Sequence, residues 1–291
     1  MKVKKAVIPA AGLGTRMLPA AKSIPKEMIT VVDRPAIHYI VDEIINSGIT
    51  DILIITARDK MPIEDYFDRS YELEDKLLKS GKERQLGEMK RIAQMADLFY
   101  IRQGDSLGLG HAVLKAKEFV GAEPFALLLG DDIVYNEGPA ATSQLCEAYE
   151  EAGMSILGVQ RTKKEELCRY GNILVEKMQG RLMQVADMVE KPPLGSEMSE
   201  FAAMGRYVLS AEVFERLESA QPDSSGEIQL TTALKALAKE GRLSAYDFEG
   251  RRYDTGNKSG YLEAVVEFGL RNEETAESFR KYLKNSAQSW K

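Results

Sequence analysis

Cysteine and histidine are scarce in this sequence of 291 residues, which contains two of each. The two cysteines, Cys146 and Cys168, cannot build a disulfide scaffold, nor can they form a zinc site by themselves. The two histidines, His38 and His111, are too few for a histidine-rich metal centre. A disulfide scaffold and a histidine-rich metal centre are therefore excluded.

Long apolar segments are also missing. No stretch approaches the roughly 18 apolar residues that a membrane-spanning helix needs. The apolar run near the first residue is too short for a signal peptide and has no cleavage region after it. We therefore expect a cytoplasmic protein with no membrane partner.

A surplus of basic residues is absent as well. Lysine and arginine number 39 against 45 aspartates and glutamates, so the formal net charge is −6. Broad binding to a nucleic-acid polymer usually needs a basic face, so we expect no such partner. If the protein binds an anion, a local group of positive side chains must do it.

What the sequence does contain is a globular composition, with 44% hydrophobic and 29% charged residues. In the first half, short apolar runs at 4–10, 51–57, 97–103 and 125–132 alternate with amphipathic stretches at 34–48 and 110–120. Strands that alternate with helices predict a parallel sheet covered on both faces. The charged segment 62–96 predicts two exposed helices broken at Ser80-Gly81.

The second half has a different pattern. Apolar runs at 154–161, 172–176, 182–191 and 201–209 have polar breaks and little helix between them, and helical spacing returns at 210–219 and 226–241. The tail from Ser259 onward is helical and charged. We therefore predict one compact α/β unit with a mixed-sheet insertion, over residues 1–291.

The strongest local signal is a glycine-containing loop that follows the first predicted strand. Small residues, Ala11, Gly12 and Gly14, allow backbone N–H groups to approach a phosphate or a base closely. Arg16 and Lys26 add two cations. The dinucleotide fingerprint is ruled out because position 17 is a methionine, and the Gly-Lys-Ser/Thr ending of a P-loop is absent. A plain glycine turn remains the alternative.

Two adjacent carboxylates, Asp131 and Asp132, follow a buried predicted strand. Like charges at such a position repel each other, and a bound divalent cation would offset that repulsion. The alternative is a solvated pair that caps a following helix.

The glycine loop and the segment after it, G-L-G-T-R followed by P-K-E-M, resemble the sugar-1-phosphate nucleotidyltransferases, in particular the bacterial UTP–glucose-1-phosphate uridylyltransferases. The resemblance extends along almost the whole chain. The other matching stretches are IRQ…GLGHAV (from Ile101), LLGDDI (from Leu128), RYG (from Arg169), VEKPP (from Val189), GRYVL (from Gly205), GEIQLT (from Gly226) and YDTGNKSGY (from Tyr253). The family fold that this implies is a Rossmann-like three-layer α/β/α sandwich with a mixed central sheet.

The resemblance implies transfer of a uridylyl group from UTP to glucose 1-phosphate, with Mg²⁺ as cofactor. It implies nucleotide binding by Ala11, Gly12, Gly14, Gln103, Gly108 and Asp132, with Gln103 reading the base. An amide offers both a donor and an acceptor, which suits the edge of uracil. His111 is expected to hold this loop rather than to act as a base.

The resemblance also assigns the sugar phosphate and the metal. The sugar-phosphate residues are Gly171, Glu190, Lys191, Gly205 and Glu227. Asp131 and Asp254 are the implied Mg²⁺ ligands, and Arg16, Lys26 and Lys191 the implied catalytic cations. As neighbours on a strand, Glu190 and Lys191 are expected to point to opposite sides.

Within the single unit, we expect a nucleotide half at about 1–160, a sugar-phosphate half at about 161–258 and C-terminal helices at about 259–291. The family also suggests a homo-oligomer, a dimer or a tetramer. Two alternatives stay open: a catalytically weak regulatory paralogue, and a thymidylyltransferase or other sugar-1-phosphate nucleotidyltransferase. The charged positions expected to be lost in a paralogue are all present, and Gln103 cannot separate uracil from thymine because both share one pairing edge.

Overall fold

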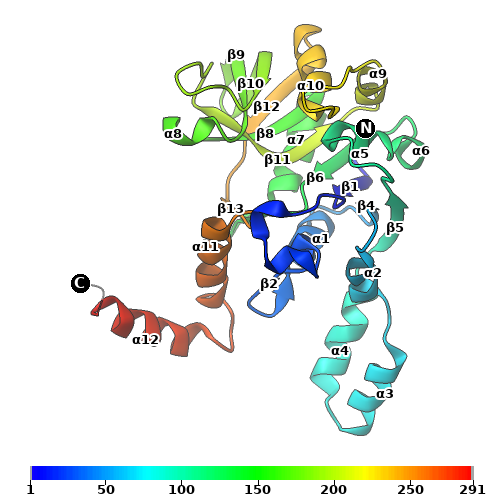
Figure 1. Ribbon diagram of the computed structural model, residues 1–291, viewed down its shortest axis with the longest axis vertical. Coiled ribbons are helices and arrows are strands. Elements are labelled where there is room, and N and C mark those ends of the chain that lie inside the picture. Colours follow the sequence, from blue (N-terminus) through cyan, green and yellow to red (C-terminus); the bar gives the residue numbers. More distant parts are fainter. Residues whose placement is uncertain (1, 290–291) are drawn as a thin grey trace.

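The computed structural model describes residues 2–289, and its centre is a sheet of nine strands within that range (Figure 1). The strands lie in the order β5-β4-β1-β6-β11-β8-β12-β10-β9. Their bounds are β1 Lys5–Pro9, β4 Asp51–Thr56, β5 Asp97–Arg102, β6 Phe125–Leu128, β8 Ser155–Arg161, β9 Gly171–Gln179, β10 Leu182–Glu190, β11 Phe201–Leu209 and β12 Leu243–Asp247.

The sheet is mixed, as predicted. Strands β5, β4, β1 and β6 run parallel to one another, which fits the alternating strands and helices of the first half. Strand β11 then joins β6 and β8 in antiparallel fashion, and the hairpin β9–β10 adds two long antiparallel strands. Strand β12 pairs with β8 in parallel, so the second half of the chain contributes one parallel pair and most of the antiparallel part.

Helices cover both faces of the sheet and make the predicted three layers. The helices are α1 Ala36–Asn46, α2 Met61–Phe67, α3 Tyr71–Lys79, α4 Glu83–Ile92, α5 Leu109–Leu114, α6 Lys117–Val120, α7 Ala141–Ala152, α8 Lys164–Leu167, α9 Glu212–Glu218, α10 Leu230–Lys239, α11 Lys258–Gly269 and α12 Ala276–Ala287. Along β1, Val7 faces one apolar core together with α5, α9 and α10, while Ala6 and Ile8 face the other together with α1, α2 and α7. Successive side chains of a strand point to opposite faces, so a fully apolar run such as β1 is buried on both sides.

In two segments the predicted number of helices is wrong. The segment 62–96 forms three helices rather than two, because the chain also breaks after Phe67; the predicted break at Ser80-Gly81 is confirmed, with Gly81 at a φ of 68°. The single helix predicted at 110–120 is two short ones, α5 and α6. Helical periodicity continued across both breaks, so the pattern did not reveal them.

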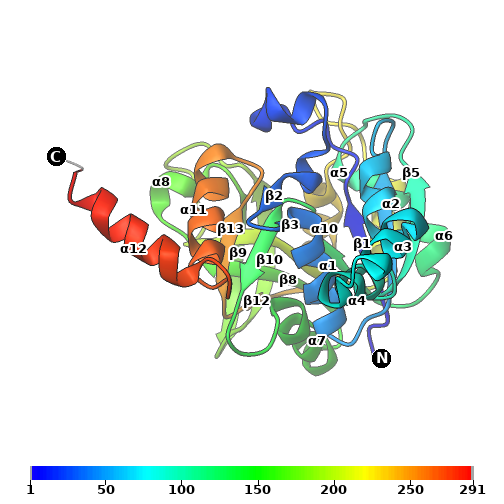
Figure 2. The same ribbon diagram turned by 90° about the horizontal axis from the view of Figure 1, so that it is seen from below.

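A second, small sheet pairs β7 (Asp132–Tyr135) with β13 (Arg251–Asp254), and a short hairpin pairs β2 (Thr30–Val31) with β3 (Arg34–Pro35). Helix α11 packs on these elements through Ala264 and Phe268. Helix α12 has no buried residue and extends away from the sheet in both views (Figure 2).

Residues 290–291 of the predicted C-terminal helical segment lie outside the described residues. Between residues 2 and 289, no helix is both long and apolar enough to cross a membrane.

Candidate functional site

A cavity of about 470 Å³ lies at the carboxyl end of β1 and β6, the edge where ligands bind in open α/β sheets. The predicted nucleotide loop lines it with Ala11, Gly12, Gly14 and Arg16. Lys26, Gln103, Gly108, Asp131 and Glu227 line it too. The structure therefore brings together most of the predicted nucleotide residues around one opening.

The glycine loop folds tightly over Lys26. Gly14 has a φ of 67°, and a Cβ there would lie 3.1 Å from Cβ of Lys26 and 3.2 Å from Cβ of Ala21. Only glycine adopts this conformation readily and leaves that space. Lys26 follows on the 3₁₀ helix η3 (Lys26–Met28), so the loop and the lysine are positioned as one piece.

The ammonium group of Lys26 lies 2.6 Å from Oδ2 of Asp131 and donates a hydrogen bond to it. Burial would lower the pKa of Lys26, but the carboxylates of Asp131 and Glu27 together outweigh burial and raise it. Burial would likewise raise the pKa of Asp131, but Lys26 holds it below its usual value. The site therefore contains a charged lysine and an ionised aspartate.

Gln103 is held by its neighbours rather than free in solvent. Its Nε2 donates to the carbonyl oxygen of Gly108 at 3.1 Å and lies 3.1 Å from Nδ1 of His111. Gly108 has a φ of 94°, and a Cβ there would come within 2.8 Å of both Cβ of Glu227 and the carbonyl oxygen of Ile228. His111 therefore contacts the residue predicted to read the base, which agrees with a role in holding the loop.

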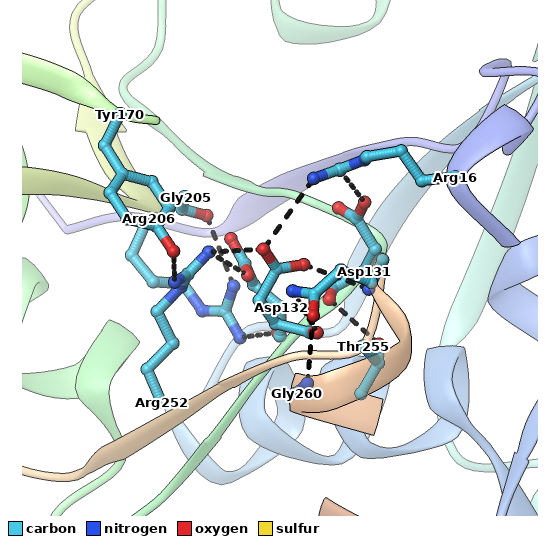
Figure 3. A network of polar contacts seen from close by, with 12 residues as sticks. Arg16, Asp131, Asp132, Tyr170, Gly205, Arg206, Arg252, Thr255 and Gly260 are labelled. Carbon is cyan, nitrogen blue, oxygen red and sulfur yellow. Dashed lines mark hydrogen bonds and ion pairs between the residues drawn. The ribbon is translucent and has the colours of Figure 1, made fainter. Parts of the chain in front are cut away.

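Asp131 and Asp254, 123 positions apart in sequence, are brought together by the pairing of β7 with β13. In that ladder Asp254 lies opposite Asp132, and the N–H and Oγ1 of Thr255 both donate to the carbonyl oxygen of Asp131 at 2.9 Å. The guanidinium of Arg16 reaches both carboxylates, at 3.4 Å from Oδ2 of Asp131 and 3.8 Å from Oδ2 of Asp254 (Figure 3). Both carboxylates therefore face one position that a cation can occupy.

These residues fit a magnesium ion by their chemistry. Mg²⁺ prefers oxygen ligands and commonly takes one or two carboxylates, with water and phosphate oxygens completing its octahedron. No cluster of three or more possible His, Cys, Asp or Glu ligands occurs in the part of the chain that the structure describes, so the protein would supply few ligands. Gly256 leaves room here, since a Cβ at that position would overlap Oδ2 of Asp131.

A second cavity of about 820 Å³ adjoins the first and shares Arg16 and Asp131 with it. Its other charged lining residues include Arg169, Lys191, Arg252 and Asp254. Four cations and three aspartates line this cavity, so the cations exceed the carboxylates in number even though the protein as a whole is acidic.

The prediction that Glu190 and Lys191 point to opposite sides is wrong. Strand β10 ends at Glu190, and Lys191 has a φ of 46°, so the two residues do not share strand geometry. Nζ of Lys191 lies 3.6 Å from Oε1 of Glu190 instead. The chain turns at Lys191, and its exposed side chain lines the second cavity.

The remaining predicted sugar-side residues lie in three different places. Oε2 of Glu190 accepts a hydrogen bond from Thr231 at 2.6 Å, and a Cβ on Gly171 would lie 3.5 Å from the same oxygen. Gly205, with a φ of 61°, lies against the carboxylate of Asp132. Glu227 instead lines the first cavity, beside Gly108.

Arg252 is a site residue that sequence reasoning missed. Its NH2 lies 2.6 Å from Oδ1 of Asp132, its NH1 donates to the Tyr170 hydroxyl at 3.1 Å, and its guanidinium stacks on the Tyr170 ring (Figure 3). The ion pair is not aligned as a hydrogen bond, since Oδ1 of Asp132 and Nε of Arg252 have no hydrogen-bond partner among the described residues. Burial, opposed by Arg252, raises the pKa of Asp132 to about 6.

Two further buried charges were also missed, Lys60 and Arg206, which are 7% and 0% exposed. Arg206 stands beside Gly205 in a quoted motif, and Arg252 stands two residues before Asp254. For Arg206 and Arg252 the available signal was a charged residue within or beside a motif, because a charged residue that is buried needs a partner. Lys60 lies between β4 and α2, beside no such motif, so no signal marked it.

The mixed sheet, the glycine loop and the paired aspartates define a nucleotidyltransferase. The sequence profile described as "Nucleotidyl transferase" matches residues 5–269, and the chain belongs to this family. It is 50% identical over 273 residues to a Bacillus subtilis protein named UTP–glucose-1-phosphate uridylyltransferase, covering 94% of this chain and 93% of that protein. A Staphylococcus saprophyticus protein named UTP–glucose-1-phosphate uridylyltransferase 2 is 47% identical, covering 97% and 98% of the two chains. The resemblance to the bacterial uridylyltransferases is thereby confirmed.

Solved structures agree. A UTP-bound UGPase from Acinetobacter baumannii superposes with a TM-score of 0.90 at 39% identity, covering 97% of this chain and 98% of that one. A UDP-glucose pyrophosphorylase complexed with UDP-glucose gives a TM-score of 0.85 at 39% identity, covering 93% and 100%. The predicted fold class is therefore confirmed.

Proposed function

We propose that this protein transfers a uridylyl group from UTP to α-D-glucose 1-phosphate and releases UDP-glucose and pyrophosphate. The observation that carries the proposal is the pair of adjoining cavities that share Arg16 and Asp131. One contains the glycine loop and Gln103, and the other contains Lys191 and Arg252. The names of the similar proteins, with UTP or UDP-glucose bound in two of the solved structures, support the same reaction.

In this reaction an oxygen of the sugar phosphate attacks the α-phosphorus of UTP, and pyrophosphate leaves on the opposite side. The two reactants are both anions, so the protein acts by positioning and by electrostatics rather than by covalent catalysis. Arg16 and Lys26 border the first cavity and would hold the triphosphate. Lys191, which lines the second cavity, would direct the attacking phosphate.

Asp131 and Asp254 would hold Mg²⁺, which when bound supplies positive charge at the α-phosphate and reduces repulsion between the two substrates. Arg16, which lies against both carboxylates, and Lys26, which is charged beside Asp131, would bind the phosphates next to them.

Base recognition would come from Gln103, with the backbone of Gly108 approaching the ring. The Gln103 amide is oriented by Gly108 and His111, which pre-organises it for one edge of a pyrimidine. Because thymine presents the same edge, dTTP is the competing substrate to measure. A Bacillus anthracis structure described as a putative glucose-1-phosphate thymidylyltransferase is 24% identical and shares the fold only.

The test is direct: purified protein is incubated with glucose 1-phosphate, Mg²⁺ and each of UTP, dTTP, ATP, CTP and GTP, and pyrophosphate and nucleotide sugar are quantified. UTP is expected to give the highest kcat/KM. Absence of UDP-glucose and pyrophosphate with UTP would reject the proposal. A rate that rises only on mixing with an active homologue would favour the regulatory paralogue.

The role of Lys191 is tested with a matched control from the neighbouring hairpin. Lys191→Ala is expected to lower kcat/KM for glucose 1-phosphate by roughly a hundredfold, by analogy with loss of a single transition-state donor. Lys177→Ala removes an exposed lysine on β9 that lines neither cavity and is expected to behave as wild type. Equal activity of both variants would remove Lys191 from the mechanism.

We also propose that residues 1–291 are one catalytic unit, with nucleotide, sugar-phosphate and C-terminal parts at about 1–160, 161–258 and 259–291, and that the protein is a dimer or tetramer. Light scattering during gel filtration measures the oligomeric state. A consumer of UTP would act in the cytoplasm, where that nucleotide is available, and cell fractionation tests this location.

A further inference from the structure

A buried lysine lies behind the nucleotide loop. Lys60 follows β4 and immediately precedes α2, and its side chain is 9% exposed. Its Nζ donates to the carbonyl oxygen of Gly12 at 2.9 Å and to Oε2 of Glu27 at 2.8 Å. The preceding residue, Asp59, has a φ of 67°, a conformation that costs free energy for a residue other than glycine. Lys60 lines neither cavity, so it does not act on a substrate directly.

The partner of this lysine, Glu27, lies beneath the site. Glu27 is fully buried, and a Cβ on Gly130 would come within 3.1 Å of its Cγ. Its second oxygen, Oε1, has no hydrogen-bond partner within residues 2–289. Lys60 and Glu27 therefore lie beneath three segments that border the first cavity: the glycine loop, Lys26 and the turn that carries Asp131.

A buried ion pair is a poor way to gain stability, because removing two charges from water costs about as much as their attraction returns. Its place in the fold has a clearer consequence. In a trans peptide, the carbonyl and the N–H of one peptide unit point in opposite directions. Since Lys60 holds the Gly12 carbonyl toward the interior, the N–H of Leu13 faces the other way, and Leu13 lines the first cavity.

The lysine also controls where the charge of Lys26 acts. Glu27 is adjacent to Lys26 in sequence, and its attraction adds to that of Asp131 on the Lys26 ammonium. With Lys60 paired to Glu27, the buried carboxylate is already balanced. Without it, Lys26 would be the nearest remaining cation to compensate Glu27.

We propose that Lys60 is a positioning residue for the nucleotide triphosphate: it fixes the glycine loop with its N–H groups toward the phosphates, and it balances Glu27 so that Lys26 stays available to the substrate. This inference rests on the proposed function for the identity of the nucleotide. It predicts a defect on the nucleotide side of the reaction, with KM for glucose 1-phosphate unchanged, because the sugar-side residues do not touch the Lys60–Glu27 pair.

The experiment measures KM for UTP, KM for glucose 1-phosphate, kcat and the melting temperature for four proteins: wild type, Lys60→Met, Lys60→Met with Glu27→Gln, and Lys79→Met. Lys79 is an exposed lysine on α3 and serves as the control, because its side chain is 74% exposed and remote from both cavities. Calorimetric titration with UTP and Mg²⁺ reports binding independently of turnover.

Lys60→Met is expected to raise KM and Kd for UTP about tenfold or more, with KM for glucose 1-phosphate changed by less than about twofold. The double variant, which leaves no unpaired buried carboxylate, is expected to recover melting temperature but to keep a raised KM for UTP, because the Gly12 carbonyl still lacks its donor. If Lys60→Met fails to fold, the KM for UTP of the double variant provides the test. Wild-type KM for UTP in the double variant would overturn the proposal, as would an equal rise in both KM values or a loss of melting temperature alone. An inactive wild type that also fails to bind UTP would instead reject the proposed function.

Discussion

The fully buried ion pair between Arg206 and Glu43 gives the most quantitative prediction. Arg206 on β11 donates from Nε and NH2 to both oxygens of Glu43 on α1, at distances of 2.7–3.1 Å. It also donates to the carbonyl oxygens of Asp132 at 2.6 Å and Gly205 at 3.2 Å. Thr142 donates twice more to Oε1 of Glu43. The guanidinium thus connects the central sheet, α1 and the strand that carries Asp132.

Replacing Arg206 with methionine keeps the volume and removes the charge. Glu43 would then be a buried carboxylate without a counter-ion, so we expect the free energy of unfolding to fall by about 3–5 kcal/mol. That is a large share of the roughly 5–15 kcal/mol that holds a typical protein folded. Adding Glu43→Gln removes the uncompensated charge and keeps an oxygen for Thr142, so the double variant should recover about 2 kcal/mol or more.

Urea unfolding at pH 7, followed by circular dichroism, measures the stability of four proteins: wild type, the two single variants and the double variant. It also shows whether the m-value is preserved. The control is Arg216→Met, because Arg216 makes the same forked contact with Glu240 at 2.8 and 3.0 Å but at the surface. It should lose only a small part of what Arg206→Met loses. A loss below about 1 kcal/mol for Arg206→Met, or a double variant no better than the sum of the single ones, would contradict the reasoning.

The remaining predictions concern the site and its supporting turns. Lys26→Met should lower the rate roughly a hundredfold in single-turnover assays, because the cation proposed to act on the triphosphate is lost; an unchanged rate would show that Lys26 only holds Asp131. Gly256→Ala places a Cβ over Oδ2 of Asp131 and should raise the Mg²⁺ concentration for half-maximal activity roughly tenfold or more, as measured by titration with Mg²⁺. Hydrogen bonds from Ser225 and Gln229 lower the pKa of Asp223 to about 2. The ionised carboxylate therefore stabilises the fold fully when the pH is above the usual pKa of an aspartate, and this contribution is lost as the pH falls toward 2. Asp223→Asn should therefore unfold at lower urea concentration than wild type at pH 7, with a gap that narrows below about pH 4; a constant gap would count against the linkage.

The local structure was readable because its causes are local. The apolar runs at β1, β4 and β6 and the amphipathic spacing of α1 indicate strand and helix whatever lies around them. The glycine loop was equally plain, since Gly14 occupies a conformation that few other residues adopt. Where breaks occurred without a strong glycine or proline signal, as after Phe67, the boundaries were wrong.

Resemblance to a family added the roles of distant residues, and the structure tests whether those residues meet. Asp131 and Asp254 do, because β13 pairs with β7 and places Asp254 opposite Asp132. Glu190 and Lys191 do not follow the strand geometry expected of them, because β10 ends between them. The periodicity of a sequence predicts side-chain direction only within a strand or helix. It does not predict the direction of the residue that follows the end of that element.

Pattern and composition alone predict the layered α/β class, the glycine loop and the need for a local cluster of cations in a protein of net charge −6. The partners of the buried charges become visible only when the chain is folded: Arg252 with Asp132, Arg206 with Glu43, and Lys60 with Glu27 and the Gly12 carbonyl. Burial forces each charge to find a partner, but the identity of that partner depends on how strands and helices far apart in the chain pack together.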